Sequence, residues 1–463
     1  MAEIQPLLIL AGSIAVLLVL ILGFKLQAFL SLLLVAIGFG LVAGMGPMET
    51  IASVQNGIGG TLGYVATVVG LGAMFGALLE TSGGVQSLAK SMVSRTNPRG
   101  TQWSLALVGF LVSIPVFLDV ALIILAPLLF GLARKTGKSV IYFGLPLLAG
   151  MMVTHTFIPP TPGPIAVADL LNADLGWVIL IGAIAGIPAM ILAGPVWTPI
   201  AMKIIGQDKE GAKLHETEES KVAAAQAEVH DKLEAKQVTA LAAVLSILLP
   251  LALILLGATA KYWLAESSVR TFLEFLGHPF VALIAATLSV YYFFGIRRGT
   301  SKKDLARIMT KALEPAGVVV VITGAGGAFK QVLIDSGMGA SLASAVAVES
   351  LPIVVFAFIV TAIVRVAQGS ATVAMITGAG LTAPVVEATI AAGIDYSQAQ
   401  LALVVIAVAS GASVLSHVND SGFWLVSRYL GMTESQTLKV FTSMTTIVGL
   451  VGFAMVLLMW MLI

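Results

Sequence analysis

Four polar stretches interrupt long apolar sequence, at residues 113–119, 154–164, 365–372 and 416–424. Their hydroxyl, amide and imidazole groups suit the hydroxyls of a polyhydroxylated compound. Prolines and glycines break helices there, and open helix ends present N–H groups that favour an anion. These stretches therefore predict a binding site for a small hydroxylated anion. The candidate substrate-binding residues are Thr154, His155, Thr161, Gly369, Ser370, Thr372, Ser416, His417, Asn419 and Ser421.

Each candidate also has a purely structural interpretation. Serine and threonine in membrane helices often bond only to the preceding turn. Ser370 and Thr372 stand where an apolar run breaks, which favours contact with substrate. His155 and His417 could serve either substrate or structure. No carboxylate cluster at ligand spacing accompanies the histidines, so we expect no metal site.

Three ionisable residues stand in apolar surroundings, where such residues are functional candidates. Asp119 has no obvious local partner, and we predict that it carries a coupling proton. Asp420 could take part in proton coupling or cap a half-helix. Arg365 could clamp a substrate carboxylate with two hydrogen bonds. Alternatively, it could pair with Asp420 or with backbone carbonyls and so hold the local structure.

The elements that position these residues must be membrane helices. The chain has 463 residues, of which 58% are hydrophobic and 11% are charged, and its mean hydropathy is +1.01. A water-soluble protein cannot cover that much apolar surface, and a net charge of +1 gives no field that attracts nucleic acid. The chain has no cysteine, which excludes disulfides and thiolate chemistry. We therefore predict an all-α polytopic membrane protein in the lipid bilayer. It is not expected to be an enzyme, because its acids and histidines lack a recognisable catalytic spacing.

Two apolar regions are too long for one span and are broken near the middle. Non-helical backbone at membrane depth is tolerated only against protein or a wet cavity, so each region predicts a re-entrant helical hairpin. Each hairpin is followed by a span that is unwound at its centre. The hairpins are expected at about 101–133 and 351–392, and the broken helices at about 139–171 and 399–430. The expected organisation is a first membrane repeat at 1–202, a charged cytoplasmic linker at 203–237 and a second membrane repeat at 238–463.

The two halves of the chain resemble each other in sequence. Residues 72–89 align with 326–343 without a gap, and Thr154-His155 aligns with Ser416-His417. An amino terminus outside the cytoplasm places all but four of the 25 Lys and Arg residues on the cytoplasmic side, as the positive-inside rule requires. This arrangement predicts periplasmic termini and two repeats of inverted topology. Inverted repeats with broken helices are typical of secondary transporters that work by alternating access.

Several segments resemble the gluconate:proton symporter (gluconate permease) family of the ion-transporter superfamily. The resemblance lies in 159–164, 326–333, 369–374 and 416–424. It implies proton-driven uptake of gluconate or a related small hydroxylated carboxylate across a bacterial-type inner membrane. It also implies a homodimer with a scaffold and a mobile transport domain. The coupling proton is the only cofactor expected, although unwound carbonyls could bind sodium. Members of that family carry His at the position of Thr161 and Glu at that of Asp119, so the exact substrate stays open.

Other functions remain compatible with the sequence. The chain could be a symporter for glycerate, fructuronate or D-serine, or an uncoupled facilitator or channel for organic anions. Accumulation against a gradient separates coupled from uncoupled transport. A membrane sensor is disfavoured, because the linker of about 35 residues is too short for an ordinary signalling domain.

Overall fold

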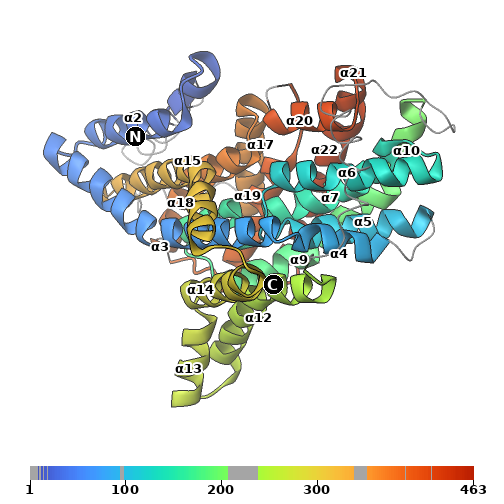
Figure 1. Cartoon of the computed structure of the whole chain (residues 1–463). Coiled ribbons are helices and arrows are strands. Elements are labelled where there is room, and N and C mark those ends of the chain that lie inside the picture. Colours follow the sequence, from blue (N-terminus) through green and yellow to red (C-terminus); the bar gives the residue numbers. More distant parts are fainter. Residues whose placement is uncertain are drawn as a thin grey trace.

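The computed structural model describes residues 9, 12–13, 15–17, 19–93, 98–206, 238–337, 352–391, 393–418 and 420–463. Every regular element in this part of the chain is a helix (Figure 1). Eight helical segments within it are long and apolar enough to span a membrane. A helix satisfies its backbone polar groups internally, as a lipid environment demands. The predicted all-α membrane fold is confirmed. Most of the charged linker, residues 207–237, lies outside the described residues.

Two long helices, α3 (Pro47–Thr81) and α15 (Lys302–Asp335), pack against each other (Figure 1). At a rise of 1.5 Å per residue each is about 50 Å long, more than the roughly 30 Å of a bilayer's hydrocarbon core. Both begin well before the apolar segments that the sequence marks. Their backbones approach closely because Gly57 faces Gly327, where a Cβ on either would collide with the other helix. Ser53 Oγ also donates to Asp335 Oδ2 at 2.6 Å.

Each half of the chain contains one helical hairpin. The first joins α5 (Pro98–Val112) to α6 (Leu118–Thr136), and the second joins α17 (Ile353–Gln368) to α18 (Ala371–Ala391). Gly369 ends α17 with a φ of +92°, a left-handed conformation that glycine adopts without steric cost. Each hairpin thus places a short non-helical turn between two apolar helices.

The two broken helices follow the hairpins. The first consists of α7 (Val140–Phe157) and α8 (Pro162–Leu170), and its break contains the cis Pro159–Pro160 bond. The second consists of α19 (Gln398–Ser413) and α20 (Ser421–Tyr429). Helix α5 packs on α7, and α17 packs on α19 in the same way. This repeated order of hairpin and broken helix confirms the predicted fold class.

The remaining helices surround these elements. They are α2 (Ala28–Val42), α4 (Gly84–Val93), α9 (Leu175–Ile191), α10 (Trp197–Ile204), α12 (Ala240–Trp263), α13 (Ser268–Gly277), α14 (Pro279–Val290), α21 (Glu434–Thr437) and α22 (Ser443–Trp460). Packing divides the helices into two groups. We call the first the long-helix group, which comprises α2–α4 and α12–α15. We call the second the hairpin group, which comprises α5–α10 and α17–α22. The most apolar windows of the α7–α8 segment and of α18 are each 89% buried, against 33% for α12. The first broken helix and α18 therefore lie at the centre, and α12 presents most of its surface outward.

Candidate functional site

A cavity of about 230 Å³ lies where the two hairpin turns meet the break before α20. Both groups of helices contribute to its wall, because α15 of the long-helix group lines one side and the hairpin group lines the rest. The cavity brings together residues more than 300 positions apart in the chain. The polar residues that line it are Asp119, His155, Arg365, Ser370, Thr372, Asp420 and Ser421, all of which the sequence marks as candidates.

Three helices begin at this cavity. The first residues of α6, α18 and α20 all line it. The first turn of a helix has N–H groups without an intrahelical partner and carries a partial positive charge. Only part of this capacity is used: Ser370 Oγ accepts from Val373 N at 3.4 Å, and Asp420 Oδ1 accepts from Gly422 N at 2.9 Å. The arrangement favours a bound anion.

Arg365 and Asp420 form a buried ion pair. Arg365 Nη2 lies 2.6 Å from Asp420 Oδ2, and the two side chains are 1% and 13% exposed. Ser416 Oγ donates to the same carboxylate oxygen at 2.5 Å. Arg365 therefore pairs with Asp420 and Asp420 caps α20, two roles that the sequence left open. Arg365 Nε and Nη1 are buried and have no partner among the described residues, so two guanidinium nitrogens, with three N–H groups between them, remain for a ligand.

His155 and Thr372 link the two halves of the chain. His155 Nε2, on α7, lies 3.2 Å from Thr372 Oγ1, on α18. The other ring nitrogen, Nδ1, is buried without a partner in the described part of the chain. Because Thr372 both donates and accepts, it can pair with either tautomer of the ring. The contact therefore fixes the ring orientation while leaving Nδ1 available.

Asp119 has a different environment from Asp420. Its side chain is exposed to the cavity at the first turn of α6, and no hydrogen bond or ion pair to it occurs among the described residues. The carboxylate of Asp420 lines the same cavity. Asp420 thus accepts hydrogen bonds from three protein donors, while Asp119 has no partner among the described residues.

Five predicted residues do not line the cavity and instead support its frame. Gly369 closes α17, and Ser416 binds Asp420. Thr154 Oγ1 donates to Phe110 O at 2.8 Å, Thr161 Oγ1 donates to Ile158 O at 2.7 Å, and His417 Nε2 lies 2.7 Å from Val366 O. In low dielectric, hydroxyls commonly bond to nearby carbonyls in this way. The remaining candidate, Asn419, lies outside the described residues.

The cavity also contains residues that sequence reasoning missed. Phe117, Met152, Val318 and Phe441 form apolar walls, and Gly422 contributes backbone next to Asp420. Nothing in the local sequence distinguishes these apolar residues from others that face lipid. Gly422 could have been found, because it occupies the first turn of a helix for which capping by Asp420 was one of the two alternatives.

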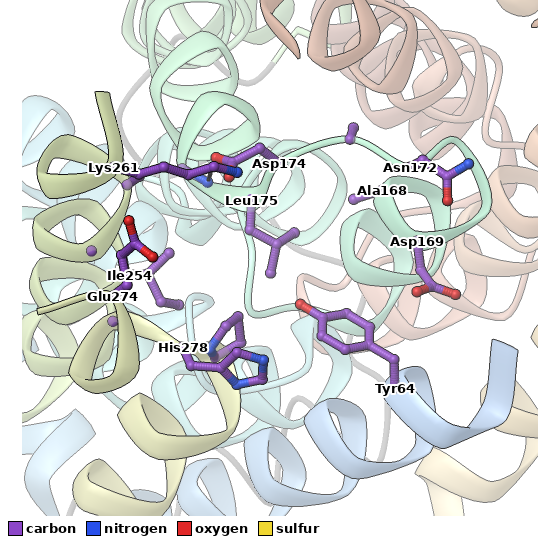
Figure 2. A pocket seen from close by; sticks show the side chains of 16 residues that line it. Tyr64, Ala168, Asp169, Asn172, Asp174, Leu175, Ile254, Lys261, Glu274 and His278 are labelled. Carbon is purple, nitrogen blue, oxygen red and sulfur yellow. Dashed lines mark hydrogen bonds between the residues drawn. The ribbon is translucent and has the colours of Figure 1, made fainter. Parts of the chain in front are cut away.

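A second cavity of about 350 Å³ lies between α3, the α8–α9 turn and α12–α14. Figure 2 shows Tyr64, Asp169 and Asp174 among its lining side chains, and none of the predicted site residues belongs to it. No cluster suited to a metal ion occurs among the described residues. Beside this turn, Lys330 Nζ donates to Leu170 O at 2.9 Å and lies 3.3 Å from Glu387 Oε1, which connects α15 to α8 and α18.

Comparisons with known proteins agree with this architecture. The model of the GntP family permeases matches residues 5–463. The chain is 40% identical to the low-affinity gluconate transporter of Escherichia coli strain K12 over 443 residues, 95% of each chain. It is 37% identical to the gluconate permease of Pseudomonas aeruginosa over 445 residues, 96% of this chain and 95% of that one. The solved structure of the YdaH transporter of Alcanivorax borkumensis is similar, with a TM-score of 0.65 at 14% identity over 92% of this chain and 96% of that one. This last likeness concerns the fold alone.

Proposed function

Because this chain belongs to the GntP permease family, whose members are multi-pass membrane transporters and not enzymes, we propose that it takes up gluconate or a closely related sugar acid together with a proton. The relatives named for gluconate support this substrate class. The proposed location is a bacterial-type inner membrane, with both termini in the periplasm and the linker in the cytoplasm. The proposed assembly is a homodimer.

The unused donors of Arg365 are the observation that carries the proposal. A planar guanidinium suits a carboxylate better than any other side chain does, and two of its nitrogens have no partner within the described residues. Three helix N-termini add positive potential around the same cavity. Ser370, Thr372 and Ser421 supply hydroxyls for the rest of the ligand. At about 230 Å³ the cavity is smaller than the 300–1,000 Å³ typical of drug-sized ligands, which fits a small sugar acid.

The charges in the cavity give a physical reason for proton coupling. Arg365 and Asp420 neutralise each other, so an ionised Asp119 would leave a negative charge beside the incoming anion. A proton on Asp119 removes that repulsion. Proton and anion then favour each other's binding, and this thermodynamic coupling is reciprocal. We assign the coupling proton to Asp119 and the structural ion pair to Asp420.

Alternating access is the proposed mode of transport. The cavity lies between α15 of the long-helix group and the two hairpin turns, so a displacement of the hairpin group against the long helices would change the side from which substrate enters. The hairpin group carries all seven polar residues of the cavity and would move with the substrate.

Uptake of labelled gluconate into proteoliposomes tests this proposal, with an inward proton gradient, no sodium, and protein-free vesicles as the control. We expect accumulation above the external concentration, which an uncoupler abolishes. Equilibration without accumulation would indicate a facilitator, and accumulation that requires sodium would contradict the proton assignment. Absence of gluconate flux would contradict the substrate, and competition with glycerate, fructuronate and D-serine would follow in the same vesicles.

A further inference from the structure

His155 holds an unused hydrogen-bonding atom in the wall of the substrate cavity. Its Nε2 is engaged by Thr372, whereas its Nδ1 is buried and has no partner among the described residues. Buried polar atoms in native proteins nearly always have a partner, and those that lack one call for an explanation. A ligand that enters the cavity is the natural partner for this atom.

The neighbours of the ring indicate which part of a ligand it would contact. Arg365 and its partner Asp420 line the same cavity of about 230 Å³ as the imidazole. A carboxylate bound by the free nitrogens of Arg365 would leave the adjacent carbon of the ligand inside this small cavity, which the ring also lines. The substituent on that carbon is a hydroxyl in gluconate and in every other 2-hydroxy acid.

We propose that His155 Nδ1 binds the 2-hydroxyl of the substrate and makes the transporter selective for 2-hydroxy carboxylates. This inference rests on the proposed function and assigns one specificity contact within it. Thr372 acts as a positioning residue, because its contact with Nε2 orients the ring. Since the two residues come from different halves of the chain, the contact exists only when the second hairpin is seated against the first broken helix.

The energetic consequence is a penalty for ligands that lack this hydroxyl. Such a ligand leaves the buried Nδ1 unpaired and excludes the water that could replace the missing group. Sites built to bind a hydroxyl reject the analogue without it far more strongly than apolar sites distinguish a methylene. We expect gluconate to compete about 10- to 100-fold better than 2-deoxygluconate, the range given by an unpaired buried polar group.

Competition against labelled gluconate in wild-type proteoliposomes and in two variants tests the assignment. The amide of glutamine reaches the position of Nε2, so no hydrogen-bonding group remains at the position of Nδ1. The amide of asparagine instead lies near the position of Nδ1. In His155→Gln the preference for gluconate over 2-deoxygluconate should fall to within about threefold, whereas His155→Asn should keep most of it. The preference over 3-deoxygluconate serves as the control and should be similar in all three proteins.

The outcomes separate this inference from the proposed function. If the wild-type protein does not bind gluconate, the proposed function itself fails. If gluconate is transported but His155→Gln keeps the full preference over 2-deoxygluconate, the role of Nδ1 is refuted. If His155→Gln does not fold, Thr372→Val provides the second test. It should weaken the same preference by releasing the ring, and an unchanged preference would refute the assignment.

Discussion

Removing the carboxylate of Asp420 leaves Arg365 as a buried cation without its ion-pair partner. The Arg365 side chain is 1% exposed, and its Nη2 lies 2.6 Å from Asp420 Oδ2. Breaking a buried pair by deleting one partner costs about 3–5 kcal/mol. Asp420 also caps α20 through Gly422 N, and loss of an N-cap costs about 1 kcal/mol. We therefore expect Asp420→Ala to lower the stability of the folded protein severely.

A set of matched variants separates these contributions. Asp420→Asn keeps the cap, because asparagine caps helices as well as aspartate does, but it removes the charge. Its loss of stability should be smaller than that of Asp420→Ala. Replacing both partners, Arg365→Met with Asp420→Asn, should restore part of the stability lost in Asp420→Asn alone, because no unpaired buried charge remains.

Thermal unfolding of the purified protein in detergent measures this order. The expected order of Tm is wild type first, then the double variant, then Asp420→Asn, with Asp420→Ala last. A double-mutant cycle, completed by Arg365→Met alone, isolates the pairwise term between these two residues, which are in direct contact. Equal Tm values for wild type and Asp420→Asn would refute the argument that this pair is desolvated. Changes in stability that simply add up in the double variant would refute it as well.

Three further changes have defined outcomes. Asp119→Asn should retain gluconate exchange between the two sides of a vesicle but lose uphill accumulation, since the neutral side chain no longer takes up a proton; accumulation at the wild-type level would contradict the coupling role. Gly76→Ala should reduce the yield of folded protein in size-exclusion chromatography, because its Cβ would collide with a carbonyl of the first hairpin turn. Gly63→Ala, on the same helix with open space around its Cβ, should be neutral or slightly stabilising, and equal yields for the two variants would refute the packing argument. Lys330→Glu should lower Tm by the equivalent of about 1 kcal/mol or less, since the pair with Glu387 is partly exposed. The charge exchange with Glu387→Lys should recover part of this loss, because Leu170 O still lacks its lysine donor, and no recovery would mean that the contact does not act as a pair.

Most of the fold could be predicted from the pattern of apolar residues. Apolar length separates spans from loops. The polar breaks at 113–119 and 365–372 include the two hairpin turns, which lie between α5 and α6 and between α17 and α18. The extents of α3 and α15 could not be predicted, because their first turns contain polar residues and hydropathy does not register a helix that continues beyond the apolar segment. The amphipathic helix α13 was missed for a related reason: it is too short to span.

The sequence predicted the chemistry of the candidate site but not which of the polar residues line the cavity. The sequence placed Arg365 and Asp420 in broken segments and offered a pair between them as one alternative. It did not distinguish Thr372, which lines the cavity, from Thr154, whose hydroxyl binds a backbone carbonyl. Both are small polar residues in breaks, and only their positions relative to other helices separate the two roles.

The sequence by itself determined the class of the molecule. Residue composition fixes how much apolar surface must be removed from water, and polar stretches that contain proline or glycine indicate where a span is interrupted, because these are local and compositional constraints. Tertiary structure decided which polar groups remain free. Whether Arg365 Nη1 or His155 Nδ1 has a partner depends on side chains from both halves of the chain, brought together by packing of α7, α17 and α18. Such long-range contacts leave no local pattern, because a hydrogen bond depends on the distance between atoms and not on their separation along the chain.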